Sequence, residues 1–216
     1  MASSFWNVTQ ELGKASLWTL GLFCITLLVA IPLGFGFCAL SRCRFKPVRV
    51  VMRVLIWIIR GTPLMLQIIL FVYAPGLVFG IVVSNRFIWV ALAFVINYAA
   101  YFSEIYRGGM ESIPLGQYEA CKVLGMTKSQ TFFKVVLPQV VKRIVPPMGN
   151  EVITLVKDTS LANVVGITEI IITANNIINS TGAIWPIFYT GVFYLVFSGL
   201  LSLLLRYVEK KLDFYR

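Results

Sequence analysis

The sequence predicts an all-α integral membrane protein, and this prediction rests on composition and on where the charges fall. Hydrophobic residues make up 58% of the 216 positions and charged residues only 13%, a balance typical of membrane-spanning chains. The apolar stretches lack the alternation that marks membrane β-strands, so spanning helices are expected. We predict one transmembrane domain over 1–216 with five spanning helices.

Three of the five expected spans are simple apolar segments, at 16–39, 87–106 and 184–205. The first has the apolar character of a signal peptide. It is long for a signal-peptide core, however, and lacks a small-residue cleavage site after a basic start. We therefore expect it to be the first span.

Lysine and arginine gather on one side of the expected spans. Most of the 19 basic residues fall in 42–60, 107–143 and 206–216, whereas Lys14 and Arg86 lie on the other side. This is the positive-inside pattern, which predicts an N-terminus outside and a basic C-terminal tail in the cytoplasm. The net charge of +10 therefore reports topology, and no nucleic-acid partner is expected.

The segment 41–60 allows two interpretations. Arg49, Arg53 and Arg60 share one helical face, which favours a helix lying in the cytoplasmic interface (about 46–60). Alternatively, the segment is the basic start of the second span.

The second span is expected to open at "RGTPLMLQ" (60–67) and to run to about 83. Thr62 is the expected N-cap, and Pro63 suits the first turn, where its missing N–H costs nothing. Pro75-Gly76 is expected to interrupt the helix.

The stretch "EACKVLGMTKSQTFFKVVLP" (119–138) is polar and follows the third span. Gly125 is predicted to end a first short helix, Thr127 to cap a second, and Pro138 to end or bend it. Two short helices at an angle would form a partly apolar cytoplasmic knob that needs a partner. The alternative is an amphipathic loop resting on lipid headgroups.

The fourth membrane segment, 140–172, carries charges on an otherwise apolar helix. Glu151 and Asp158 are seven residues apart and share one helical face with Lys157 nearby. An ionised group at mid-membrane costs on the order of 3 kcal/mol or more unless it is paired or hydrated. The stripe therefore either lines a polar path, with the helix breaking near Asp158, or holds a Lys157 ion pair that only locks helix packing. The candidate pathway residues are Glu151, Thr154, Lys157, Asp158, Thr159 and Ser160.

Residue sets for catalysis or metal binding are missing from the sequence. There is no histidine, and the four cysteines show neither disulfide nor metal-ligand spacing. No Walker-type phosphate loop occurs. We expect no enzyme activity, metal or cofactor in this chain.

"EACKVLG", followed after nine residues by "VVLP", resembles the EAA loop of the permease subunits of ABC importers. Cys121 stands for the third alanine of that pattern and Val135 for the usual isoleucine. Three more segments, "RGTPLMLQ" (60–67), 97–120 and 149–166, are similar to the polar amino-acid branch, which includes histidine, arginine, glutamine and glutamate permeases. The resemblance covers most of 15–210 and implies a MetI-like type I importer permease.

The resemblance also implies partners and a location. Two ATP-binding cassette subunits, which hold ATP and Mg, would receive the loop at about 112–138 as coupling helices. A second permease subunit, either the same chain or a homologue, would complete the route, and an extracytoplasmic binding protein would deliver the amino acid. The setting would be lipid of the bacterial cytoplasmic (inner) membrane. The expected coupling residues are Glu119, Ala120, Cys121, Gly125, Leu137 and Pro138.

An ion-coupled secondary transporter that uses Glu151, Lys157 and Asp158 is the alternative function. No internal inverted repeat is evident, and five spans are few for such a carrier. The sequence names neither the amino acid carried nor the second permease. It also leaves open whether the stripe meets substrate or serves packing.

Overall fold

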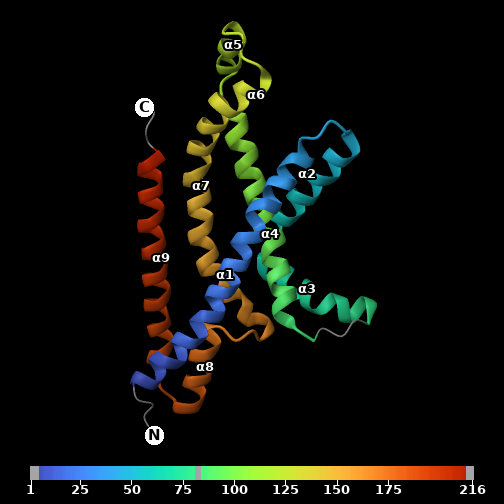
Figure 1. Ribbon diagram of the computed structural model, residues 1–216. Coiled ribbons are helices and arrows are strands. Elements are labelled where there is room, and N and C mark those ends of the chain that lie inside the picture. Colours follow the sequence, from blue (N-terminus) through green and yellow to red (C-terminus); the bar gives the residue numbers. More distant parts are fainter. Residues whose placement is uncertain (1–4, 81–83, 213–216) are drawn as a thin grey trace.

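The computed structural model describes residues 5–80 and 84–212, and the secondary structure within them is entirely helical. Figure 1 shows long helices running the length of the molecule and two short ones, α5 and α6, projecting beyond one end. The elements in order are α1 (Phe5–Ser41), α2 (Lys46–Gly61), α3 (Leu64–Phe79), α4 (Arg86–Glu111), α5 (Leu115–Val123), α6 (Lys128–Gln130), a π-helical segment (Thr131–Val136), α7 (Leu137–Asp158), a 3-10 segment (Thr159–Val165), α8 (Ile170–Thr181) and α9 (Trp185–Leu212).

Three helices, α1, α4 and α9, are long and apolar enough to cross a membrane singly. Two bent pairs reach that length together. They are α2 with α3, which meet at 107°, and the helix Lys128–Val165 with α8, which meet at 53°. Length and composition thus give three crossings, or up to five if each bent pair is one span. Figure 1 places the start of α1 and the end of α9 at opposite ends of the molecule.

The core is built around the crossing of α1 and α4, which pack against each other more than any other pair. Phe94, Tyr98 and Phe102 on α4 are fully buried there. A Cβ added at Gly34 on α1 would lie 2.8 Å from the Cβ of Phe102. The absence of a side chain at Gly34 therefore allows the two backbones to approach closely.

The segment 41–60 forms a helix of its own, α2, which folds back alongside α1 (Figure 1). Because α2 and α3 meet at 107°, the segment is not the straight start of a second span. Its position at a membrane interface remains a prediction.

The expected cap of α3 was wrong. Thr62 ends α2, and its hydroxyl donates back to the carbonyl oxygen of Ile58 at 2.9 Å. Pro63 occupies the N-cap position of α3 instead, with an extended backbone and no side-chain cap. The residue before a proline is disfavoured in the helical region, which explains why the chain turns at Thr62.

The expected interruption of the second span at Pro75-Gly76 was also wrong. α3 continues through Pro75 and ends at Gly80, which has a φ of +65°. The stretch 81–83, where the span was expected to end, lies outside the described residues.

The polar loop after α4 follows the prediction up to Thr127 and then departs from it. Gly125, with a φ of +69°, stops α5, and Thr127 forms a reciprocal capping box with Gln130. Pro138 does not end the next helix, because the chain continues into α7. The turn directly before Pro138 is π-helical, with the Leu137 N–H donating to the carbonyl oxygen of Phe132, so the proline enters the chain where the helix is already widened.

The fourth membrane segment breaks later than the sequence indicated. The α-helix ends at Asp158, but the chain continues as a 3-10 helix to Val165 before it bends. Gly166, with a φ of +75°, makes the turn, and Glu169 then caps α8.

Candidate functional site

A cavity of about 510 Å³ lies where the junction of α2 and α3 meets α4 and α7. Its lining combines charged, aromatic and amide side chains with a few apolar ones. The lining residues are Arg60, Gly61, Thr62, Pro63, Leu64, Asn97, Tyr98, Tyr101, Glu151, Thr154, Asp158 and Leu161.

Three of the six predicted pathway residues, Glu151, Thr154 and Asp158, meet in this cavity. Their spacings of three and four residues place them on one face of α7, as the helical period requires. α7 is held against α4, which supplies Tyr98 and Tyr101 to the opposite wall. The polar stripe is therefore a wall of the cavity.

The other three predicted residues lie outside the lining. Thr159 is fully buried, and its hydroxyl donates to the carbonyl oxygen of Val156 at 2.6 Å. Ser160 donates to the carbonyl oxygen of Lys157 at 2.7 Å. Both hydroxyls bond to the backbone of the preceding turn, where α-helix gives way to 3-10 helix.

Lys157 is exposed and does not form the predicted ion pairs. Over residues 5–80 and 84–212, no ion pair joins Lys157 to Glu151 or to Asp158. The interpretation of the stripe as a helix-locking ion pair of Lys157 is therefore wrong.

Asp158 is held by a neighbouring helix. The Tyr98 hydroxyl donates to Oδ2 of Asp158 at 2.8 Å. The Arg60 guanidinium lies 5.1 Å above the centroid of the Tyr101 ring, within cation–π range. The cavity thus presents the carboxylates of Glu151 and Asp158 from α7 and the guanidinium of Arg60 from the end of α2.

Gln67 organises the bend beside the cavity, although the sequence analysis did not select it. Its Nε2 donates to the carbonyl oxygen of Ile59 at 2.7 Å and to Oγ1 of Thr62 at 2.8 Å. Its Oε1 accepts from Nδ2 of Asn97 at 3.0 Å. A lone glutamine after apolar residues in "RGTPLMLQ" was the available signal, since a buried amide needs partners.

The predicted coupling residues fall on α5, at Gly125 in the turn after it, and on the start of α7. Glu119 and Ala120 are exposed on α5, whereas Cys121 is buried. Leu137 and Pro138 open α7. Figure 1 shows α5 and α6 together at one end of the molecule, beyond the long helices.

This projecting end carries apolar side chains that the chain itself leaves uncovered. Val123, the last residue of α5, is 87% exposed, and Leu124, its C-cap, is 77% exposed. Leu115, Tyr118 and Phe133 are exposed as well. We refer to α5, α6 and these five residues as the coupling knob.

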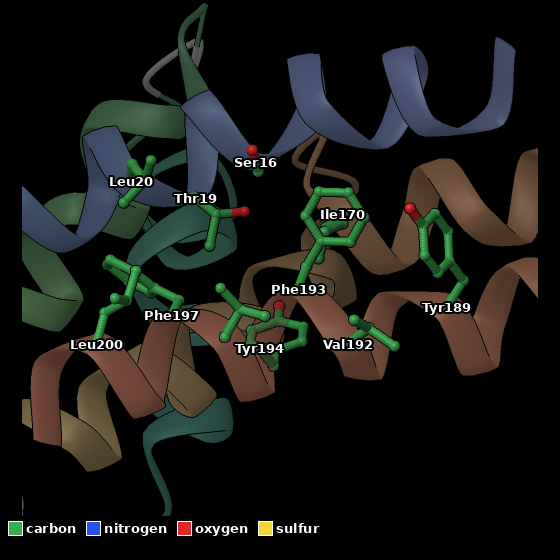
Figure 2. A pocket seen from close by; sticks show the side chains of 11 residues that line it. Ser16, Thr19, Leu20, Ile170, Tyr189, Val192, Phe193, Tyr194, Phe197 and Leu200 are labelled. Carbon is green, nitrogen blue, oxygen red and sulfur yellow. The ribbon is translucent and has the colours of Figure 1, made fainter. Parts of the chain in front are cut away.

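A second pocket, of about 350 Å³, lies between α1 and α9 and has a different character. Figure 2 shows Thr19 of α1 facing Phe193 and Phe197 of α9 across it. Its lining contains no charged side chain. It offers no ionic partner to a ligand, so the cavity with charged side chains is the candidate site.

Within residues 5–80 and 84–212, no three histidine, cysteine or acidic side chains lie close enough together to hold a metal ion. The cysteines in these residues are free. The cavity's chemistry is therefore that of hydrogen bonding and charge.

The chain belongs to the family of binding-protein-dependent transport system inner membrane components, whose model matches residues 20–214. It is therefore a membrane component of a transport system rather than an enzyme. This is the class that the EAA resemblance implied, and the matched range includes both the cavity and the coupling knob.

Curated relatives cover most of the chain. The L-cystine transport system permease protein TcyB of Bacillus subtilis is 34% identical over 215 residues, covering 98% of this chain and 89% of that protein. The arginine ABC transporter permease protein ArtM of Haemophilus influenzae is 32% identical over 195 residues, covering 87% of this chain and 86% of that protein.

Solved structures agree with this family at the level of the fold. The crystal structure of an amino acid ABC transporter with histidines superposes with a TM-score of 0.89, at 29% identity, over 98% of this chain and 100% of that chain. An inward-facing structure of the MetNI methionine ABC transporter superposes with a TM-score of 0.68, at 16% identity, over 99% of both chains. The fold is thus the all-helical MetI-like permease fold.

Proposed function

We propose that this chain is the permease subunit of an ATP-driven ABC importer that brings a polar amino acid into the cytoplasm. Relatives named for L-cystine and arginine support the substrate class. In this proposal the chain crosses the bacterial cytoplasmic membrane five times. Each bent pair counts as one crossing, and the coupling knob lies on the cytoplasmic side.

The observation that carries the proposal is the coupling knob. Its apolar residues are exposed at the tip of the molecule, where burial of a large apolar side chain would contribute about 1.5–3 kcal/mol each. Glu119 is exposed on the same short helix and would give a partner a polar anchor. A cytoplasmic ATPase subunit, which would supply the ATP-binding and Mg-binding residues, is the partner we propose for this surface.

The cavity beside α7 is the proposed part of the route. An amino acid carries an ammonium and a carboxylate group, and the cavity offers Glu151 and Asp158 to the first and Arg60 to the second. Charge-assisted hydrogen bonds of this kind are the strong ones. Arg60 takes the role that the sequence analysis gave to Lys157, because Arg60 lines the cavity and Lys157 does not.

A second permease subunit is needed to close the route. In α9, only 6% of the most apolar window is buried within this chain, so most of that helix faces lipid or a neighbour. In the proposed assembly, two permease subunits enclose the path between them, and an extracytoplasmic binding protein delivers the amino acid to it.

The test is co-purification from native membranes in mild detergent, with the attached proteins identified by mass. We expect an ATPase at about one copy per permease chain in the wild type. Glu119→Lys should remove it and abolish uptake while the permease stays in the membrane. Glu11→Lys is the matched control. It makes the same charge reversal at an exposed position near the start of α1, outside the coupling knob. Full ATPase retention and full uptake in the Glu119→Lys variant would refute the coupling assignment.

A further inference from the structure

A second charged cavity lies beside the first, on the other side of Arg60. It has a volume of about 320 Å³ and is lined by Arg53, Ile56, Trp57, Arg60, Glu104 and Arg107. It opens between α4 and the second half of α2, toward the bend between α2 and α3. None of its lining residues except Arg60 belongs to the proposed substrate cavity.

The acid in this cavity is already satisfied by one arginine. Arg107 donates to both carboxylate oxygens of Glu104, with Nη2 to Oε2 at 2.6 Å, and its Nη1 donates to Glu111 at 2.5 Å. Such multiple charge-assisted hydrogen bonds fix the geometry of the pair. Glu104 and Arg107 therefore neutralise each other, and neither is free to bind an added ion.

Arg53 and Arg60 are left with positive charge in excess. Arg60 reaches Glu104 only at 3.6 Å. Arg53 makes one hydrogen bond, from Nε to the carbonyl oxygen of Ser41, and no ion pair within the described residues. Seven residues separate them, so they lie about 10 Å apart along one face of α2 and can converge on a single anion.

Trp57 lies between these two arginines in the sequence, and its exposed ring favours a lipid over a soluble anion as the ligand. It is 73% exposed, and Val54 and Ile58 beside it are exposed too. Tryptophan favours the headgroup level of a bilayer, where one part of the ring is apolar and its N–H is wet. A soluble anion would gain nothing from this surface, whereas a lipid would contact it with its glycerol and acyl segments.

We propose that this cavity binds the phosphate group of an anionic phospholipid, with Arg53 as the hydrogen-bonding ligand and the charge of Arg60 contributing from the boundary with the substrate cavity. The acyl chains would lie along the exposed apolar side of α2 at Trp57. The bound lipid would brace α2 at its bend with α3, next to the substrate cavity that shares Arg60. This inference depends only on the chain lying in a bilayer, not on which solute is carried.

The test is lipid retention by the purified transporter complex. The complex is reconstituted with equal amounts of phosphatidylglycerol and phosphatidylcholine, extracted in mild detergent, and its bound lipid is counted by native mass spectrometry. We expect the wild type to retain phosphatidylglycerol preferentially. Arg53→Gln should lower that retention about tenfold or more, because it removes a charge-assisted hydrogen bond to the lipid phosphate that Arg49 does not make.

Arg49→Gln is the matched control, since it removes the same charge from the same face of α2 but outside the cavity. It should leave retention unchanged. Trp57→Ala should lower retention without changing the charge, with an unaltered elution volume of the complex as the check on folding. Equal losses in the Arg49→Gln and Arg53→Gln variants, or no preference for phosphatidylglycerol, would overturn the proposal.

A competition experiment with inorganic phosphate tests whether the cavity binds a lipid phosphate or a soluble anion. Inorganic phosphate added alone at the concentration of the lipid phosphate should displace no bound phosphatidylglycerol. Displacement to the level of the Arg53→Gln variant would show a soluble-anion site and would refute the lipid assignment.

Discussion

The Tyr98 hydroxyl on α4 donates a 2.8 Å hydrogen bond to Oδ2 of Asp158 at the last residue of α7. The tyrosine ring is fully buried, so the bond is made at the edge of the core and points the carboxylate into the cavity. It links the core helix of the fold to the wall of the proposed route at the position where α-helix changes to 3-10 helix. The orientation of Asp158 therefore depends on α4 as much as on α7.

Removing this hydrogen bond should destabilise the protein. Tyr98→Phe keeps the ring and deletes only the hydroxyl, and a hydrogen bond to a charged group is worth about 1.5–3 kcal/mol. We expect a lower apparent melting temperature of the purified permease in detergent, together with weaker uptake. Tyr101→Phe is the control for stability, since no hydrogen bond of that hydroxyl occurs among the residues described. Equal melting temperatures for Tyr98→Phe and wild type would contradict the assignment.

The pair of Gln67 and Asn97 should behave as one unit. Gln67→Leu leaves Nδ2 of Asn97 buried without its acceptor, which costs about 1–3 kcal/mol, and Asn97→Leu removes the donor in turn. The double variant should therefore lose less stability than the sum of the single ones, with a coupling of about 0.5–3 kcal/mol. Gln67→Leu combined with Thr127→Ala, which lies in the coupling knob, should be additive. Additive effects for Gln67 and Asn97 would show that the bend is held by other contacts.

The close approach of α1 and α4 should not tolerate a methyl group. A Cβ at Gly34 would lie 2.8 Å from the Cβ of Phe102 and 2.9 Å from the carbonyl oxygen of Ala99, so the helices must separate. Gly34→Ala is expected to lower stability by about 1–3 kcal/mol, as overpacking does. Gly36→Ala, two residues further along the same helix, meets nothing within 4 Å and should be neutral or slightly stabilising. Thermal unfolding of the two variants is the measurement. Equal melting temperatures for Gly34→Ala and Gly36→Ala would contradict the prediction.

The buried carboxylate of Glu169 should act as a helix cap. Oε1 accepts from the backbone N–H of Ile172 at 2.9 Å, and Oε2 accepts from the Tyr194 hydroxyl at 3.3 Å. Glu169→Ala removes the N-cap of α8 and should cost about 1 kcal/mol or more. Glu169→Gln keeps one acceptor oxygen and should lose less. If glutamine and alanine are equally destabilising in thermal unfolding, the cap is not what Glu169 supplies.

Much of the architecture follows from the sequence because its signals are local. The apolar segments 16–39 and 87–106 lie within α1 and α4, and 184–205 coincides with α9 from Trp185 onward, since a long apolar run in lipid has only the helix available. Gly125 and Thr127 also act as their residue types indicated. A left-handed turn favours glycine, and an N-cap favours a side chain with an acceptor oxygen, such as threonine.

The positions that failed are those where local preference was overridden by packing or by neighbouring turns. Pro75-Gly76 was expected to interrupt the second span and Pro138 to end or bend the second short helix, yet α3 continues through Pro75 and the helical chain continues through Pro138 into α7. A proline removes one backbone hydrogen bond, and a helix can continue past it when the other hydrogen bonds of that turn are kept. Thr62 likewise caps nothing, because its hydroxyl bonds back into α2.

The sequence by itself determined that the chain is helical and belongs in a membrane, and that Glu151, Thr154 and Asp158 share one helical face. These depend on composition and on a fixed helical period. Only the tertiary structure decided that this face meets Arg60, Tyr98 and Tyr101 in one cavity, and that Lys157 does not join it. The reason is geometric: periodicity fixes which side chains point the same way, whereas the crossing of α4 and α7 and the bend after Gly61 fix what they point at.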